Sequence, residues 1–135
     1  MEPVLEIKGL KIQFQSKGGL LTAVDGLDLS LGRGETLGLV GESGCGKSVT
    51  ALSILQLLPK PAGRIAAGQI LFEGRDLVKM STAEIRRIRG NEISMIFQEP
   101  MTSLNPIYTV GFQIQEVLRK HRRMDKAVEE LQLLP

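Results

Sequence analysis

The sequence predicts an α/β fold in which a β-rich N-terminal layer precedes part of a parallel sheet with helices. Three observations favour this class. Residues 4–14 alternate apolar and polar side chains like a half-exposed strand, residues 36–40 are apolar nearly throughout, and residues 49–58 carry apolar side chains at helical spacing. With 135 residues, of which 42% are hydrophobic, the chain is long enough to bury a core.

The N-terminal layer is predicted from short strands separated by turn residues. A Gly-Gly pair at residues 18–19 indicates a turn after the first strand. Residues 21–24 and 27–31 then suit two further short strands, separated by an Asp-Gly turn at residues 25–26 and closed by glycines at 32–34.

The apolar run at residues 36–40 suits a strand of a parallel sheet that is covered on both faces. After a glycine-rich loop, residues 49–58 are predicted to form a helix that prolines at 59 and 61 end. The later predicted elements are a strand and turn at 68–74, a short helix opened by a capping box at 81–84, a strand at 93–97, an exposed loop at 98–106, and helices at 110–120 and 125–134.

The glycine-rich loop has the spacing of a phosphate-binding loop, in which glycine is followed by four residues and then Gly-Lys-Ser. Glycines let backbone N–H groups curl around phosphate oxygens, while Lys47 would reach the terminal phosphates and Ser48 would ligate Mg²⁺. The loop consists of Gly41, Glu42, Ser43, Gly44, Cys45, Gly46, Lys47 and Ser48. The alternative is a glycine-rich turn that joins a strand to a helix.

The overall charge indicates no general attraction to nucleic acid or anionic lipid, because 17 basic and 15 acidic residues give a formal net charge of only +2. The basic groups at 86–89 and 119–123 are interpreted as solvated helix surfaces, and His121 as a surface residue without a second metal ligand at suitable spacing. No apolar run approaches the roughly 18 residues of a membrane-spanning helix, and the N-terminus lacks a secretory pattern. A cytoplasmic location is therefore expected, and the single Cys45 agrees with a reducing compartment.

Two motifs, in this order, resemble the ATP-binding subunits of ABC transporters, and within them the oligopeptide, dipeptide and nickel importer group. The first is the Walker A loop at residues 41–48 followed by Val49, where this group often has valine. The second is the Ile-Phe-Gln-Glu-Pro-Met-Thr-Ser-Leu-Asn-Pro stretch at residues 96–106, which is similar to the Q-loop of the group.

The resemblance spans essentially the whole chain and implies the N-terminal part of a P-loop NTPase of the ABC type, with ATP and Mg²⁺ as cofactors. Residues 1–98 would be part of the ATP-binding core, and residues 99–135 the Q-loop continuation and the start of the helical subdomain. In the full-length family, ATP hydrolysis is coupled to solute import through a membrane permease. The resemblance does not identify the transported solute.

The resemblance also assigns roles to Phe14 and Gln98. Phe14 would stack on adenine, with a half-buried strand residue as the alternative. Gln98 would be the Q-loop glutamine, which contacts Mg²⁺ or the attacking water, with a loop-capping amide as the alternative. Residues 93–99 superficially imitate a Walker B strand, but the neutral amide of Gln98 gives Mg²⁺ less stabilisation than an aspartate, so that interpretation is rejected.

The partners implied are integral membrane permease subunits that contact the loop at 99–108, a second ABC ATPase subunit, and indirectly a solute-binding protein. Phe112 departs from the acidic residue expected on the docking surface. This places the protein on the inner face of the cell membrane, and no nucleic-acid partner is expected.

The signature motif, the Walker B carboxylates, the D-loop and the switch histidine come later in family members and are missing from this sequence. The chain is therefore expected to end within the helical subdomain and to bind nucleotide without turning it over alone. Two other functions stay open: a non-catalytic nucleotide-binding fragment, and a soluble ABC-type ATPase that acts on nucleic acid or the ribosome. A GTPase is disfavoured because no Asp-x-x-Gly or Asn-Lys-x-Asp element is present.

Overall fold

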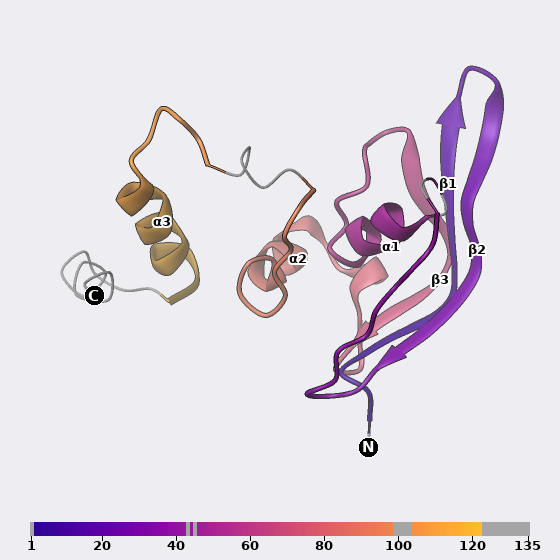
Figure 1. Cartoon of the computed structure of the whole chain (residues 1–135), viewed down its shortest axis with the longest axis horizontal. Coiled ribbons are helices and arrows are strands. Elements are labelled where there is room, and N and C mark those ends of the chain that lie inside the picture. The colour runs from indigo at the N-terminus through magenta and orange to yellow at the C-terminus, as the bar shows by residue number, and fades with distance from the viewer. Residues whose placement is uncertain (1, 43, 45, 99–103, 123–135) are drawn as a thin grey trace. The chain divides into compact units, whose positions relative to one another are not determined.

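The computed structural model describes residues 2–42, 44, 46–98 and 104–122. Contacts between Cα atoms divide the chain into two compact units, Met1–Ile85 and Arg86–Pro135. The first unit holds a four-stranded sheet and a helix, and the second holds the longest described helix (Figure 1). The mixture of helices and strands agrees with the predicted α/β composition.

The sheet is antiparallel, with strand order β2-β1-β3-β4. Its strands are β1 (Leu5–Ser16), β2 (Gly19–Leu31), β3 (Gly63–Phe72) and β4 (Arg75–Asp76). The predicted first strand and the turn at residues 18–19 are confirmed. β3 begins at Gly63, five residues before the predicted start, because Gly63 and Arg64 pair with Phe14 and Gln13 of β1.

β2 is one continuous strand, so the predicted turn at Asp25 and Gly26 is wrong. Two adjacent residues of β1, Leu10 and Lys11, pair with Leu27 and Asp25, and the register skips Gly26. Gly26 has a φ of 76°, which a glycine adopts at a β-bulge. Because β1 pairs with β2 on both sides of this point, the glycine makes a bulge within the strand and the chain does not reverse.

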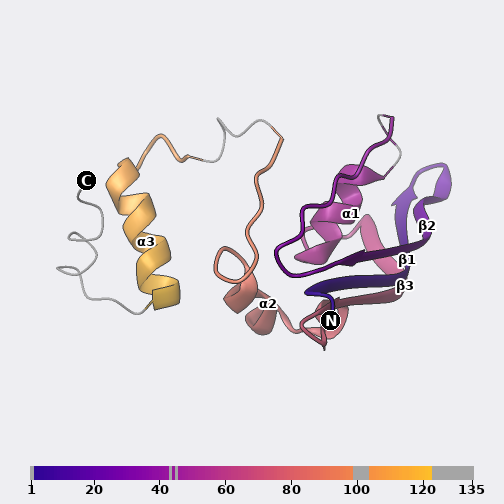
Figure 2. The same ribbon diagram turned by 60° about the horizontal axis from the view of Figure 1, so that its bottom comes forward.

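The core of the first unit lies between the sheet and the segments that cover it. α1 (Lys47–Ile54) lies along one face of the sheet, as Figure 1 and Figure 2 both show. A 3-10 helix, η1 (Leu77–Lys79), and α2 (Thr82–Ile88) follow the strands. The largest fully buried side chains among the described residues are Ile7, Leu10, Ile12, Ser53, Ile70, Leu77 and Ile85.

α1 ends at Ile54, four residues before the predicted end. Gln56 takes a left-handed conformation with φ 55°, and its N–H donates to the carbonyl of Ser53 at 3.2 Å. The next N–H, of Leu57, donates to the carbonyl of Leu52 at 2.9 Å, which completes a Schellman motif. A tertiary contact supports this early end, because Gln56 Nε2 donates to two carbonyls of the segment that contains η1.

Two apolar segments that were predicted as strands, residues 36–40 and 93–97, are not strands in this structure. Val40 is 91% exposed and Ile96 is 89% exposed. Among the described residues neither segment has a neighbouring strand, apart from an isolated bridge between Arg89 and Ile93. A strand depends on hydrogen bonds to a neighbour, so apolar composition alone does not form it. The predicted parallel part of the sheet is therefore absent from the described residues.

The capping box that opens α2 is confirmed. The N–H of Glu84 donates to Ser81 Oγ at 3.2 Å, and the Ser81 hydroxyl donates to Glu84 Oε1 at 3.0 Å. The predicted helix at 110–120 is also confirmed, as α3 (Val110–Arg122). The described part of the predicted loop, residues 98 and 104–106, is exposed. The helix predicted at 125–134 lies outside the described residues.

Gln113 ties the loop before α3 to the first turn of that helix. Its Oε1 accepts the N–H of Asn105 at 2.9 Å, and its Nε2 donates to the carbonyls of Asn105 and Tyr108 at 3.0 and 3.1 Å. The rings of Tyr108 and Phe112 stack with centroids 5.0 Å apart. The loop is therefore a folded element, although Ile107 is 83% exposed.

Candidate functional site

The glycine-rich loop meets α1 at Lys47, so the predicted order of loop and helix is confirmed. Gly46 is the N-cap residue of α1, with φ 96° and ψ 5°. Gly44 also has a positive φ, of 83°. Both conformations are ones that residues with a Cβ atom rarely adopt. The loop therefore uses its glycines for backbone geometry, as the motif predicts.

Gly46 is also required by packing. A Cβ atom on Gly46 would lie 2.9 Å from Val24 Cγ2 and 3.1 Å from the carbonyl oxygen of Ala23. Ala23 is itself an extra residue in β2, because Ile12 pairs with Val24 while Gln13 pairs with Thr22. This bulge places a backbone carbonyl directly against the loop. Close approach of β2 and the start of α1 thus depends on glycine at position 46.

Lys47 is half-buried and lies over the start of its own loop. Its Nζ donates to the carbonyl oxygen of Gly41 and, at 3.4 Å, to that of Glu42. Lys47 is also the first residue of α1, and a helix N-terminus favours negative charge through its N–H groups and dipole. Together these groups provide the positive surroundings that a phosphate requires.

Thr50 holds the residue that starts the helix. Its Oγ1 donates to the carbonyl oxygen of Gly46 at 2.7 Å, and its backbone N–H donates to the same oxygen at 3.0 Å. The side chain is 4% exposed. The next hydroxyl on this side of α1, Ser53 Oγ, donates to the carbonyl of Thr50 at 2.6 Å. The two buried residues of α1, Thr50 and Ser53, therefore both carry hydroxyl groups.

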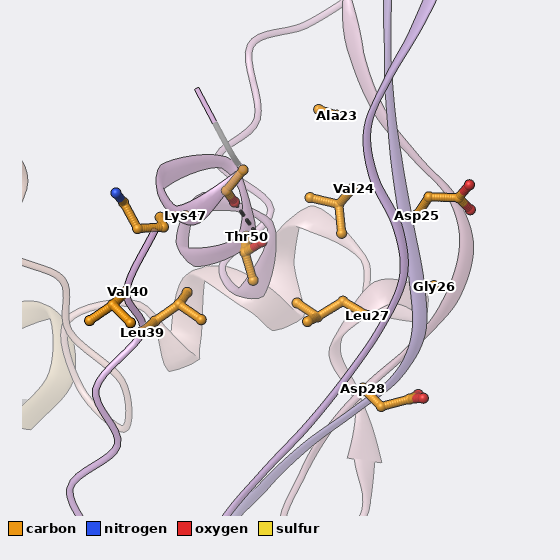
Figure 3. A pocket seen from close by; sticks show the side chains of 11 residues that line it. Ala23, Val24, Asp25, Gly26, Leu27, Asp28, Leu39, Val40, Lys47 and Thr50 are labelled. Atoms are coloured by element: carbon orange, nitrogen blue, oxygen red, sulfur yellow. Dashed lines mark hydrogen bonds between the residues drawn. The ribbon is translucent and has the colours of Figure 1, made fainter. Parts of the chain in front are cut away.

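A cavity of about 540 Å³ lies between β2 and the start of α1 (Figure 3). Val24 and Leu27 point toward Thr50 in this view, whereas Asp25 and Asp28 point away from it. The wall contributed by β2 is therefore mainly apolar, and the polar groups come from the loop and α1. The cavity is lined by Ala23, Val24, Asp25, Gly26, Leu27, Asp28, Leu39, Val40, Gly46, Lys47 and Thr50.

The other predicted loop residues take several environments. Gly41, Glu42 and Ser48 are exposed, and Val49 is half-buried in the first turn of α1. Ser43 and Cys45 lie outside the described residues. Ser48 therefore lies on the exposed side of α1.

Phe14 and Gln98 are not among the residues that line the cavity. Phe14 is half-buried in β1, and its Cε1 lies 2.8 Å from the position of a Cβ atom on Gly63. Gln98 is exposed and belongs to the second unit. The adenine and Q-loop roles of these two residues stay predictions.

The sequence did not identify the residues that contact Gly46, which are Ala23 and Val24 of β2 and Thr50. A hydroxyl residue two positions after Ser48 offered a signal for Thr50, because threonine in a helix can bond the carbonyl four residues back. The β2 bulge had no comparable signal, since it arises from pairing with β1.

Within residues 2–42, 44, 46–98 and 104–122, no group of three or more His, Cys, Asp or Glu side chains is placed to hold a metal ion. None of the described helices is both long and apolar enough to cross a bilayer.

The chain aligns over most of its length with two curated bacterial proteins. It is 52% identical to the "Oligopeptide transport ATP-binding protein OppD" of Bacillus subtilis (strain 168), over 97% of this chain and 38% of that protein. It is 48% identical to the "Dipeptide transport ATP-binding protein DppD" of the same organism, over 99% of this chain and 40% of that protein. The chain therefore spans about two fifths of the length of these relatives.

The fold is also similar to solved structures. The dimeric structure of MJ0796, a bacterial ABC transporter cassette, aligns with a TM-score of 0.78 at 20% identity, covering 93% of this chain and 52% of that chain. A structure of MJ0796 in a post-hydrolysis state, bound to ADP and Pi, aligns with a TM-score of 0.75 at 19% identity. At these identities the likeness shows the fold, which is that of an ABC ATPase cassette.

A model of one protein family covers the loop, α1 and all later residues. It is described as "ABC transporter" and matches residues 24–135. The glycine geometry of the loop and the cassette fold agree with this match. The chain belongs to the ABC transporter family.

Proposed function

We propose that this chain binds ATP through the loop at residues 41–48. The observation that carries the proposal is the start of α1, where left-handed Gly46 precedes Lys47 and the Lys47 ammonium lies over the loop. Phosphate groups bind well at such helix N-termini. The relatives in B. subtilis are named ATP-binding proteins, which supports ATP as the ligand.

In this proposal, Lys47 contacts the terminal phosphates, and the backbone of residues 41–46 surrounds them. Mg²⁺ prefers oxygen ligands, so the Ser48 hydroxyl and the Gln98 amide oxygen are chemically suited to hold it. The bound ion would neutralise phosphate charge. Phe14 would stack on the adenine ring, as predicted from the sequence.

For the whole protein, we propose ATP-driven import of peptides or related solutes. The names of the two relatives, oligopeptide and dipeptide transport proteins, support this solute class. Permease subunits would contact the loop at 99–108, where Ile107 and Tyr108 are 83% and 52% exposed. A second ATPase subunit would complete the site, a solute-binding protein would act indirectly, and the protein would work on the inner face of the membrane.

Hydrolysis would require more residues than this sequence contains. Phosphoryl transfer needs a group that orients the attacking water, and no apolar run in the sequence ends in Asp-Glu. The chain by itself would therefore bind Mg-ATP and release little phosphate.

Calorimetric titration with Mg-ATP tests the proposal. The wild-type chain should bind ATP saturably. Lys47→Ala should weaken binding at least about 100-fold, because it removes the charge-assisted contact between the ammonium and the phosphates and also the side chain that lies over the loop. Lys17→Ala, which removes an exposed lysine of the β1–β2 turn, is the matched control and should bind like wild type. Unchanged affinity in Lys47→Ala would refute the proposed site.

A further inference from the structure

The Thr50 hydroxyl has no part in the motif that defines the loop, yet it contacts the residue on which the loop geometry depends. It is 4% exposed, it lines the cavity, and it donates to the carbonyl oxygen of Gly46 at 2.7 Å (Figure 3). A threonine hydroxyl at any position of a helix can donate a hydrogen bond to a carbonyl one turn earlier in the same helix. Here the acceptor is the left-handed N-cap residue.

The peptide group after Gly46 is held by Thr50 and lies close to β2. Its carbonyl accepts two hydrogen bonds from Thr50, one from the side chain and one from the backbone. On the side of β2, Val24 and the Ala23 carbonyl leave no room for a Cβ atom at Gly46, so only glycine fits between Thr50 and β2. Fixing this carbonyl also fixes the direction of the Lys47 N–H, since both belong to one planar peptide.

We propose that Thr50 is a positioning residue of the phosphate loop, which orients the Gly46–Lys47 peptide N–H toward bound phosphate by holding the Gly46 carbonyl. The inference deepens the proposed function and rests on it for the identity of the ligand. Thr50 itself does not touch the phosphate. Thr50 orients the loop amide before the ligand binds. Binding therefore costs less conformational entropy.

Three variants separate this role from general stabilisation of α1. Thr50→Val keeps the volume and removes the hydroxyl, whereas Thr50→Ser keeps the hydroxyl. Ser53→Ala is the matched control, because Ser53 also donates a buried hydroxyl to a helix carbonyl but lies one turn away from the loop. Mg-ATP affinity is measured by calorimetry, and hydrogen exchange of the Gly46 and Lys47 amides is measured without nucleotide.

Thr50→Val should weaken Mg-ATP binding about 2- to 10-fold, the effect of one neutral hydrogen bond, and should speed exchange of the loop amides. Thr50→Ser should have the affinity and the exchange rates of wild type. Ser53→Ala should lower the melting temperature without changing the affinity or the exchange rates. Equal affinity and exchange in Thr50→Val and wild type would overturn the inference, as would an equal loss of affinity in Ser53→Ala. Absence of ATP binding in wild type would contradict the proposed function, and the exchange rates would then decide the role of Thr50.

Discussion

The side chain of Val24 lies 2.9 Å from the position that a Cβ atom on Gly46 would occupy. This contact joins β2 to the N-terminus of α1, and it forms where the register of β2 has an extra residue, Ala23. The geometry of the loop at residues 41–48 is thus linked to the pairing of β1 with β2, although Val24 precedes Gly46 by 22 residues in the sequence.

Gly46→Ala should therefore destabilise the first unit more than a glycine substitution at an open position. Alanine at Gly46 would be strained at φ 96° and would also meet the Ala23 carbonyl, which as backbone cannot rotate away. The expected loss is about 2–4 kcal/mol of unfolding free energy. Gly74→Ala is the control, since Gly74 has φ 82° with nothing near its Cβ position, and it should lose about 1–2 kcal/mol. Equal losses in urea titrations would contradict the packing argument.

Gln56 should contribute to stability through its side chain despite its strained backbone. Gln56→Ala removes hydrogen bonds to the carbonyls of Leu77 and Met80 and keeps φ near 55°, so it should lose about 1–3 kcal/mol. Gln56→Gly loses the same bonds but relieves the strain, so it should be about 1 kcal/mol more stable than the alanine variant. A glycine variant less stable than the alanine variant in urea titrations would be inconsistent with this assignment.

Gln113 should control the order of the loop at 104–109. Gln113→Ala removes the acceptor for the Asn105 N–H and the donor to the Asn105 and Tyr108 carbonyls, so the Asn105 amide should exchange with solvent at least about 5-fold faster. Gln115→Ala, on the same helix, is the control and should leave that rate unchanged. If both variants gave the same exchange rate, the loop would not depend on Gln113.

The sequence predicted those elements whose cause is local. The alternation in β1, the glycine turn before β2, the capping box at Ser81 and the amphipathic pattern of α3 each depend on residues close to one another, and the structure contains all four. The glycine spacing likewise identified the loop, because the requirement for positive φ at Gly44 and Gly46 is a property of those residues.

The predictions that were wrong depend on distant parts of the chain. Asp25-Gly26 has turn chemistry, yet pairing with β1 converts it to a bulge. The apolar residues Leu39 and Val40 suit a buried strand, but a strand also requires a neighbour, and the described residues supply none. α1 ends early because the Gln56 side chain finds acceptors more than 20 residues away.

The same reason explains which parts of the site the sequence could indicate. Lys47 belongs to a fixed spacing, whereas the β2 wall at Ala23 and Val24 reaches Gly46 only through the sheet register. Thr50 is intermediate, because its bond to Gly46 spans one helical turn and could be anticipated once the start of α1 is known.

The most direct test of nucleotide binding by this loop is a titration of the isotope-labelled chain with Mg-ATP, followed through its backbone amide resonances. The account predicts saturable shifts that are largest for the amides of Gly44, Gly46 and Lys47, and their loss in Lys47→Ala. It would be contradicted if Mg-ATP left these three amides unmoved, or if the largest saturable shifts arose at residues remote from the start of α1.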